Sequence, residues 1–227
     1  MSTRDQILAR IAANLRRGWG AGGGHAHRTP SRATVEKPSA LPLGKRFTTE
    51  LEALGGHVHA AQHHAEAIEA VITICAGRRA PCVLAWYEDQ VELPGLRHAL
   101  FDRKIGYDTG WLPDGEPARA ERLQSLERIA VGVTGALAGI AESGTLVVVS
   151  GPGRPRLASL LPPVHVAILR ADRLYASLPD LLAAHPRLPD EGSNLVLITG
   201  PSRTADIEMT LTRGVHGPGE VHVVLVG

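Results

Sequence analysis

Four apolar, β-branched runs of strand length lie toward the end of this 227-residue chain and constrain its fold most. They read GTLVVVS, VHVAILR, NLVLITG and EVHVVLVG, at residues 144–150, 164–170, 194–200 and 220–227. A half-exposed strand alternates apolar and polar residues, whereas these runs are apolar at consecutive positions. Strands of this kind belong inside a sheet that other layers cover. The runs therefore predict an α/β fold of three layers with a largely parallel or mixed sheet.

Residues 45 onward alternate between helical and extended patterns. We expect strands at 57–61, 82–87, 104–109 and 129–135, and helices at 45–56, 63–78, 95–103, 116–128, 155–163 and 204–214. Only residues 135–143 separate the runs 129–135 and 144–150, and a parallel crossover needs a dozen or more residues. These two strands are therefore either antiparallel neighbours or members of different parts of a mixed sheet.

The first 44 residues differ from the rest of the chain. Residues 1–17 have the apolar spacing of an amphipathic helix, and residues 18–44 are rich in Gly, Pro, Ser and Arg, as in a flexible linker. We therefore predict an N-terminal helical arm, a linker and an α/β domain at 45–227.

Charge is unevenly distributed between these parts. Residues 1–44 hold seven Lys/Arg and two acidic residues, a net charge of +5. This leaves a net charge of −4 for the domain, because the whole chain has a net charge of +1. The arm is either a solvated tail or a contact for an acidic partner.

Composition excludes several classes of protein. A net charge of +1 is not that of a nucleic-acid binder, and no run of about 20 apolar residues predicts a membrane span. Two cysteines cannot supply the four thiolates of a common iron–sulfur cluster, and the histidines at 57, 59, 63 and 64 do not match a zinc spacing. No signal-peptide pattern is present, so we predict a reduced, cytoplasmic protein without a metal or cofactor of its own.

Glycine-rich turns at predicted strand ends are the candidate ligand site. Open α/β sheets bind ligands beyond the carboxyl ends of their strands, and backbone N–H groups there favour anions. Arg154 would add a fixed positive charge. The alternative is that these glycines only make tight turns, since neither a P-loop nor GxGxxG is present. The candidate ligand-binding residues are Thr134, Gly135, Thr145, Gly151, Gly153, Arg154, Gly200, Ser202, Thr204 and His216.

Several polar residues of the closing stretch have a structural explanation on the sequence alone. Ser202 and Thr204 would cap the helix predicted from 204, with Asp206 and Glu208 in its first turn. On a helix the two acids diverge by about 200°, which makes them a poor acid–base pair. Glu142, where a predicted turn meets a strand, is the one candidate catalytic carboxylate, and its alternative is a solvated turn residue.

Two long stretches resemble a known family. GVTGALAGIAESGTLVVVSGPGRPRLASLLPPVHVAIL and NLVLITGPSRTADIEMTLTRGVHGPGEVHVVLV are similar to the LUD (lactate utilisation) domain of the LutC type, strongest over residues 129–227. The resemblance implies a NagB/RpiA/CoA-transferase-like fold and a part in bacterial oxidation of L-lactate to pyruvate. It also implies LutA-like and LutB-like iron–sulfur proteins as partners, with this chain as the cluster-free member. Glu142 resembles the catalytic Glu of CoA transferases by analogy of fold.

Three functional hypotheses follow. In the first, the chain is a LutC-like component of a lactate-oxidising system and binds a small anion. In the second, it is a free-standing enzyme of the CoA-transferase or isomerase type with Glu142 as catalytic carboxylate. In the third, it is a non-catalytic interaction module that docks through its basic arm.

Overall fold

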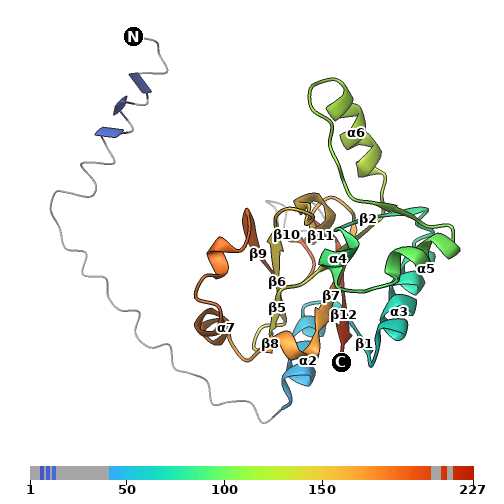
Figure 1. Cartoon of the computed structure of the whole chain (residues 1–227). Coiled ribbons are helices and arrows are strands. Elements are labelled where there is room, and N and C mark those ends of the chain that lie inside the picture. The colour runs from blue at the N-terminus through green and yellow to red at the C-terminus, as the bar shows by residue number, and fades with distance from the viewer. Residues whose placement is uncertain (1–5, 8, 11, 14–40, 206–210, 214–216) are drawn as a thin grey trace. The chain divides into compact units, whose positions relative to one another are not determined.

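A six-stranded, entirely parallel sheet forms the centre of the α/β fold (Figure 1). The structure, a computed structural model, describes residues 6, 7, 9, 10, 12, 13, 41–205, 211–213 and 217–227, and those described between 6 and 13 are helical. The strands of the sheet, in spatial order, are β1 (His57–Ala61), β12 (Glu220–Val226), β7 (Val164–Arg170), β4 (Val131–Gly135), β2 (Cys82–Ala85) and β3 (Gly106–Asp108).

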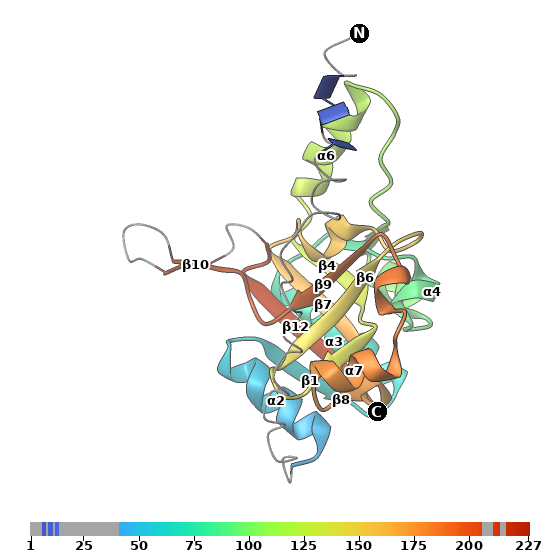
Figure 2. The ribbon, with the colours of Figure 1, turned by 90° about the vertical axis from the view of Figure 1, so that its left-hand side faces the viewer.

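A second, four-stranded mixed sheet lies against one face of the parallel sheet (Figures 1 and 2). It contains β8 (Leu174–Tyr175), β5 (Ala138–Ile140), β6 (Thr145–Ser150) and β9 (Asn194–Ile198) in that order. The predicted strands at 129–135 and 144–150 therefore belong to different sheets, one of the two arrangements that their short connection allowed. The four-residue turn 141–144 suffices because β5 and β6 pair antiparallel.

Helices cover the remaining faces. Helices α3 and α5 pack on the face of the parallel sheet opposite the small sheet, and α2 packs beside β1 and β8. The helices are α2 (Leu43–Ala53), α3 (His64–Gly77), α4 (Glu88–Val91), α5 (Leu96–Asp102), α6 (Ala118–Glu127) and α7 (Leu178–Ala184), and the short 3₁₀ helices are η1 (Arg156–Ser159), η2 (Ala171–Arg173) and η3 (Leu188–Asp190).

Two hydrophobic cores explain why the apolar runs are apolar on both faces. The larger core extends from α2 and α3 through the parallel sheet to the inner face of the small sheet, and includes Leu146 and Val148. The smaller core joins Val147 and Val149, on the other face of β6, to Leu181 of α7. Every residue of β6 is therefore buried. The prediction of an α/β fold with a largely parallel sheet is confirmed, with a small mixed sheet where we expected helices.

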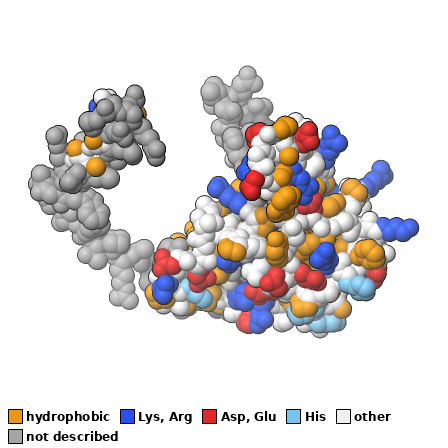
Figure 3. Space-filling view, turned by 45° about the horizontal axis from the view of Figure 1, so that its top comes forward, with side chains coloured by type: hydrophobic (Ala, Val, Ile, Leu, Met, Phe, Trp, Pro, Cys, Tyr) orange, Lys and Arg blue, Asp and Glu red, His pale blue; other side chains and the backbone are white. Residues whose placement is uncertain are grey.

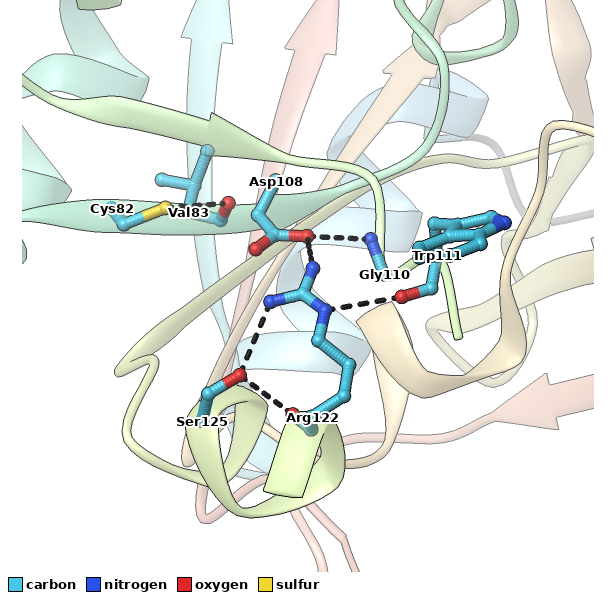
Figure 4. A network of polar contacts seen from close by, with 7 residues as sticks. All are labelled: Cys82, Val83, Asp108, Gly110, Trp111, Arg122 and Ser125. Atoms are coloured by element: carbon cyan, nitrogen blue, oxygen red, sulfur yellow. Dashed lines mark hydrogen bonds and ion pairs between the residues drawn. The ribbon is translucent and has the colours of Figure 1, made fainter. Parts of the chain in front are cut away.

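Helix α6 stands away from the sheets at the end of a long connection (Figure 1). Its anchor is Arg122, which donates to the Asp108 carboxylate at 2.6 Å, to the Trp111 carbonyl at 3.1 Å and to the Ser125 hydroxyl at 3.1 Å (Figure 4). Asp108 also accepts from the Gly110 N–H at 2.8 Å. One guanidinium thus links α6 to the end of β3.

The helix predicted at 204–214 is wrong for the described part of that segment. Strands β10 (Arg203–Ala205) and β11 (Leu211–Arg213) pair antiparallel instead. The segment contains many β-branched residues, which lower helix propensity and favour strands. Helix capping therefore does not explain Ser202 and Thr204, and Asp206 and Glu208 lie outside the described residues.

Three further expectations need correction. The helix predicted at 155–163 is only the four-residue η1, because prolines bracket it. The run 194–200 forms an edge strand, β9, with one exposed face, where Leu195 and Leu197 are 36% and 43% exposed, and one face that is only partly buried. Helix α7, with Ser177 as its N-cap, was not predicted.

Candidate functional site

The order of the parallel strands contains a switch point between β2 and β4. From β2 the chain moves outward to β3 at the sheet edge, and β4 then returns on the other side of β2 and continues toward β7 and β12. In open α/β sheets the crevice at such a point, beyond the carboxyl ends of the strands, is where ligands bind. The topology alone therefore directs attention to the ends of β2, β4 and β7.

A cavity of about 60 Å³ lies at this place, and we call it the switch-point cavity. Its walls include Trp86, directly after β2, Gly135 at the end of β4 and Arg170 at the end of β7. Arg154 and Arg173 also line it, together with one carboxylate, Glu92. By volume the cavity holds roughly four water molecules, the size of a small organic acid.

The turn at residues 151–154 is held against the end of β2 by two hydrogen bonds. The Tyr87 N–H donates to the Gly153 carbonyl at 2.8 Å, and the Trp86 indole N–H donates to the Pro155 carbonyl at 3.2 Å. Gly135 lets α4 approach, because a Cβ there would lie 2.7 Å from the Gln90 carbonyl oxygen. The predicted glycine-rich turn therefore places Arg154 at the switch point.

Three guanidinium groups make the cavity electropositive. Arg154 donates to the Glu191 carbonyl at 2.9 Å, while its buried Nε has no hydrogen-bond partner among the described residues. Arg173 pairs with Glu92 at 2.8 Å. Arg170 bonds to Asp172, and this hydrogen bond holds the pKa of the Asp172 carboxyl below its usual value. Arginine recognises carboxylates through charge-assisted hydrogen bonds, so the arrangement suits a small anion.

The structure divides the sequence-predicted residues between two places. Gly135 and Arg154 line the switch-point cavity, and Gly151 and Gly153 belong to the turn that carries Arg154. Gly200 and Ser202 line a second cavity, which lies near the amino-terminal ends of β7 and β12.

Thr134, Thr145 and Glu142 line neither of these two cavities. Thr134 is buried and bonded to the His165 ring at 2.9 Å, and Thr145 is bonded to the Thr199 hydroxyl at 2.8 Å. Glu142 is exposed in the β5–β6 turn, where its carboxylate accepts the Leu178 N–H of α7 at 3.2 Å. The side chain of Thr204, and all of His216, lie outside the described residues.

Sequence reasoning missed Arg170, Arg173 and His165. Arg170 directly follows a predicted buried strand, and that position is itself a signal, because carboxyl ends of parallel strands face the ligand crevice. Arg173 follows in the next turn. His165 offers no such signal, since its neighbours in sequence are those of any buried strand.

Three histidines gather at the β1 edge of the sheet. The His57 and His59 rings stack on His222, with centroids 4.7 and 5.3 Å apart, and His59 and His222 share a hydrogen bond of 3.0 Å. Burial and the two neighbouring histidines lower the pKa of His222 to about 4. Within the described parts of the chain, no group of three His, Cys, Asp or Glu side chains has a metal-binding arrangement. Among the same residues, no helix is long and apolar enough to cross a membrane.

Comparisons with known proteins agree on one family. The model of the LUD domain matches residues 44–226. An uncharacterized protein of Neisseria meningitidis is 29% identical, over 86% of this chain and 91% of its own length. Proteins named lactate utilization protein C from Macrococcus caseolyticus and Halalkalibacterium halodurans are 37% and 35% identical, over 49% and 60% of this chain. These matches cover 50% and 58% of the two relatives, so the chain aligns with little more than half of each.

A solved structure shares the fold. The crystal structure of a DUF162 family protein from Deinococcus radiodurans superposes with a TM-score of 0.59 at 19% identity, covering 82% of this chain and 96% of that one. This likeness supports the α/β architecture. The family match extends over the whole α/β part of the chain, both sheets and both cavities included. The chain therefore belongs to the LUD domain family.

Proposed function

We propose that this LUD domain chain is a cluster-free, LutC-like component of a cytoplasmic system that oxidises L-lactate to pyruvate, and that its switch-point cavity binds a small carboxylate. Family membership and the names of the lactate utilization protein C relatives support the first part. The observation that supports the second part is the convergence of Arg154, Arg170 and Arg173 on one small cavity at the switch point.

The size and charge of the cavity favour a short monocarboxylate. A volume of about 60 Å³ is small for a nucleotide or a CoA ester, whereas lactate and pyruvate are three-carbon acids. A carboxylate would take a charge-assisted hydrogen bond from Arg154, whose buried Nε has no partner within the described structure.

The proposed partners are LutA-like and LutB-like iron–sulfur proteins. Oxidation of lactate releases electrons that a chain with two cysteines has no cluster to accept. Such clusters would therefore belong to partner subunits. The finer fold assignment, to the NagB/RpiA/CoA-transferase-like group, is part of the same proposal.

Substitution of Arg154 tests the carboxylate site. We expect Arg154→Gln to weaken pyruvate or L-lactate binding, measured by isothermal titration calorimetry, by at least about tenfold, which is a loss of about 1.4 kcal/mol. Arg187→Gln is the matched control, because Arg187 is 87% exposed and does not line the cavity. Equal binding by the wild type and Arg154→Gln would contradict the proposal.

Glu142→Gln tests the alternative of a free-standing enzyme. The amide oxygen of Gln still accepts the Leu178 N–H, so the cap on α7 survives the change. We expect lactate-dependent reduction by the assembled system to be unchanged. Lost activity in a folded, assembled variant would instead favour Glu142 as a catalytic carboxylate.

A further inference from the structure

An acidic side chain, Glu92, lines the switch-point cavity beside the three arginines. Glu92 directly follows α4, and its carboxylate forms a two-point pair with Arg173, whose Nη1 donates to Oε1 at 3.0 Å and whose Nη2 lies 2.8 Å from Oε2. Arg173 belongs to η2, so the pair joins the segment after β2 to the segment after β7. A carboxylate of the chain itself therefore occupies one guanidinium of the proposed anion site.

The local structure gives little reason for a carboxylate at position 92. The backbone there is left-handed, with φ 57° and ψ 33°, a conformation that glycine adopts most readily. The side chains of Glu92 and Arg173 are 40% and 35% exposed, and ion pairs open to solvent contribute little to stability. Because Arg173 also lines the cavity, a solute there can reach its guanidinium. These observations favour a role of the pair in ligand selection over a role in folding.

The three cavity arginines differ in how their charges are balanced. Asp172 pairs with Arg170, and Glu92 pairs with Arg173. Arg154 instead donates to a neutral backbone carbonyl, a bond that leaves its charge uncompensated. One carboxylate can therefore pair with Arg154 and displace nothing, whereas a second carboxylate has to compete with an acid of the chain. Glu92 is the competitor that a ligand meets, because it lines the cavity and Asp172 does not.

We propose that Glu92 makes the switch-point cavity selective for ligands with one carboxylate over ligands with two. A second carboxylate would have to break the two-point bond between Glu92 and Arg173, and the negative charge of Glu92 would repel it. The selectivity rests on the carboxylate site proposed above and adds selection by charge to selection by size. The ligand class is thus a small monocarboxylate, and small dicarboxylates are rejected.

Malonate tests this selectivity, because it is a three-carbon acid like pyruvate but carries a second carboxylate. Isothermal titration calorimetry on the full-length chain, at one pH and one ionic strength, measures the affinities for both acids. We expect the wild type to bind pyruvate at least about tenfold more tightly than malonate, since an unfavourable charge contact has a cost of at least this size. Malonate binding by the wild type that is as tight as pyruvate binding would overturn the role of Glu92.

Glu92→Gln removes the charge and keeps the shape of the side chain. The Gln amide oxygen still accepts one hydrogen bond from Arg173, while the second bond and the repulsion are lost. We expect the affinity for malonate, relative to that for pyruvate, to rise at least about tenfold in this variant. Such a gain of binding cannot come from a misfolded chain. An unchanged ratio of the two affinities in Glu92→Gln overturns the proposal.

Asp89→Asn is the matched control for the loss of one negative charge. Asp89 lies in α4, three residues before Glu92, is exposed and does not line the switch-point cavity. We expect this variant to keep the ratio of the two affinities within about twofold of the wild-type value, because salt screens exposed charges. An equal gain of malonate binding in Asp89→Asn and Glu92→Gln would mean that overall charge sets the ratio, and would overturn the role of Glu92.

A double variant identifies the second contact of malonate. We expect Arg173→Gln, added to Glu92→Gln, to remove the gain of malonate binding, because no freed guanidinium is then left at position 173. Retention of the gain would overturn Arg173 as that contact.

The same titrations separate the two proposals. If the wild type does not bind pyruvate, or if Arg154→Gln binds it equally well, the carboxylate site itself fails and the selectivity with it. If pyruvate binding depends on Arg154 and Glu92→Gln leaves the ratio unchanged, only the role of Glu92 fails.

Discussion

Gly132 is the position where β4 passes closest to another part of the backbone. A Cβ on this residue would lie 1.9 Å from the carbonyl oxygen of Ala158 in η1. We expect Gly132→Ala to lower the free energy of unfolding by about 3 kcal/mol, since η1 would have to move. Urea denaturation measures the change. Gly77→Ala is the matched control: nothing lies within 4 Å of its Cβ position at the end of α3, so the same added methyl should not destabilise.

His165 makes stability depend on pH. Its pKa is lowered from 6.5 to about 4 in the folded protein, so between these values the unfolded chain binds a proton that the folded chain does not. Stability from this residue is present above pH 6.5 and is lost as the pH falls toward 4, by about 3 kcal/mol in total. Unfolding free energies measured between pH 7 and 4 check the slope.

A comparison of variants isolates the contribution of His165. His222, whose pKa is also lowered to about 4, adds a dependence of the same sign, so the wild-type slope alone does not identify the residue. We expect His165→Gln to reduce the slope by about one proton, whereas His98→Gln, at an 82% exposed site on α5, should leave it unchanged. Equal slopes in the wild type and His165→Gln would contradict the prediction.

At the scale of elements, α6 depends on a single side chain more than on hydrophobic packing. Leu126 is its one buried residue, and Arg122 supplies the bonds to Asp108 and Trp111. We expect Arg122→Met to make the connection at 109–117 several-fold more sensitive to limited proteolysis, with little change in the melting temperature. Arg119→Met, at an exposed position of the same helix, should leave proteolysis unchanged. A large drop in melting temperature for Arg122→Met would instead mean that α6 folds with the core.

The elements also show where local patterns decide structure and where they do not. Strands β4, β6 and β7 form where apolar β-branched runs predicted them, because such runs are stable only when buried. Strands β10 and β11 formed instead of a helix, because cross-strand pairing supplies hydrogen bonds that a local pattern does not reveal. The exposed face of β9 was also missed because it depends on strand pairing. The sequence of β9 resembles that of a central strand, but β9 pairs with β6 alone and therefore lies at the edge of its sheet.

At the scale of the whole molecule, the chain divides into Met1–Pro38 and Ser39–Gly227. All of the buried hydrophobic residues described lie between Phe47 and Val226. We therefore expect deletion of residues 1–38 to leave the melting temperature within about 2 °C of the wild-type value, measured by differential scanning calorimetry. A larger fall would contradict this division of the core.

The same deletion tests the interaction-module hypothesis. If the basic arm docks on a partner, removal of residues 1–38 should abolish co-purification with the LutA-like and LutB-like proteins while the α/β domain stays folded. Unchanged co-purification would rule out the arm as the docking segment. Acidic and basic side chains are interspersed on the face of the molecule in Figure 3, so this view shows no large patch of one sign that would serve in its place.

The sequence by itself determined the main strands and helices between residues 45 and 135 and the likeness to the LUD domain, because both depend on residues close together in the chain. It also indicated Arg154 beside a glycine-rich turn at a strand end. Only the tertiary structure decided that Arg154, Arg170 and Arg173 share one cavity, that Gly200 and Ser202 belong to another, and that Glu142 caps α7. The physical reason is that strand order sets which loops meet. Strand order depends on pairing between segments that are far apart in the chain, such as β1 and β12. The local composition of each segment does not specify its pairing partner.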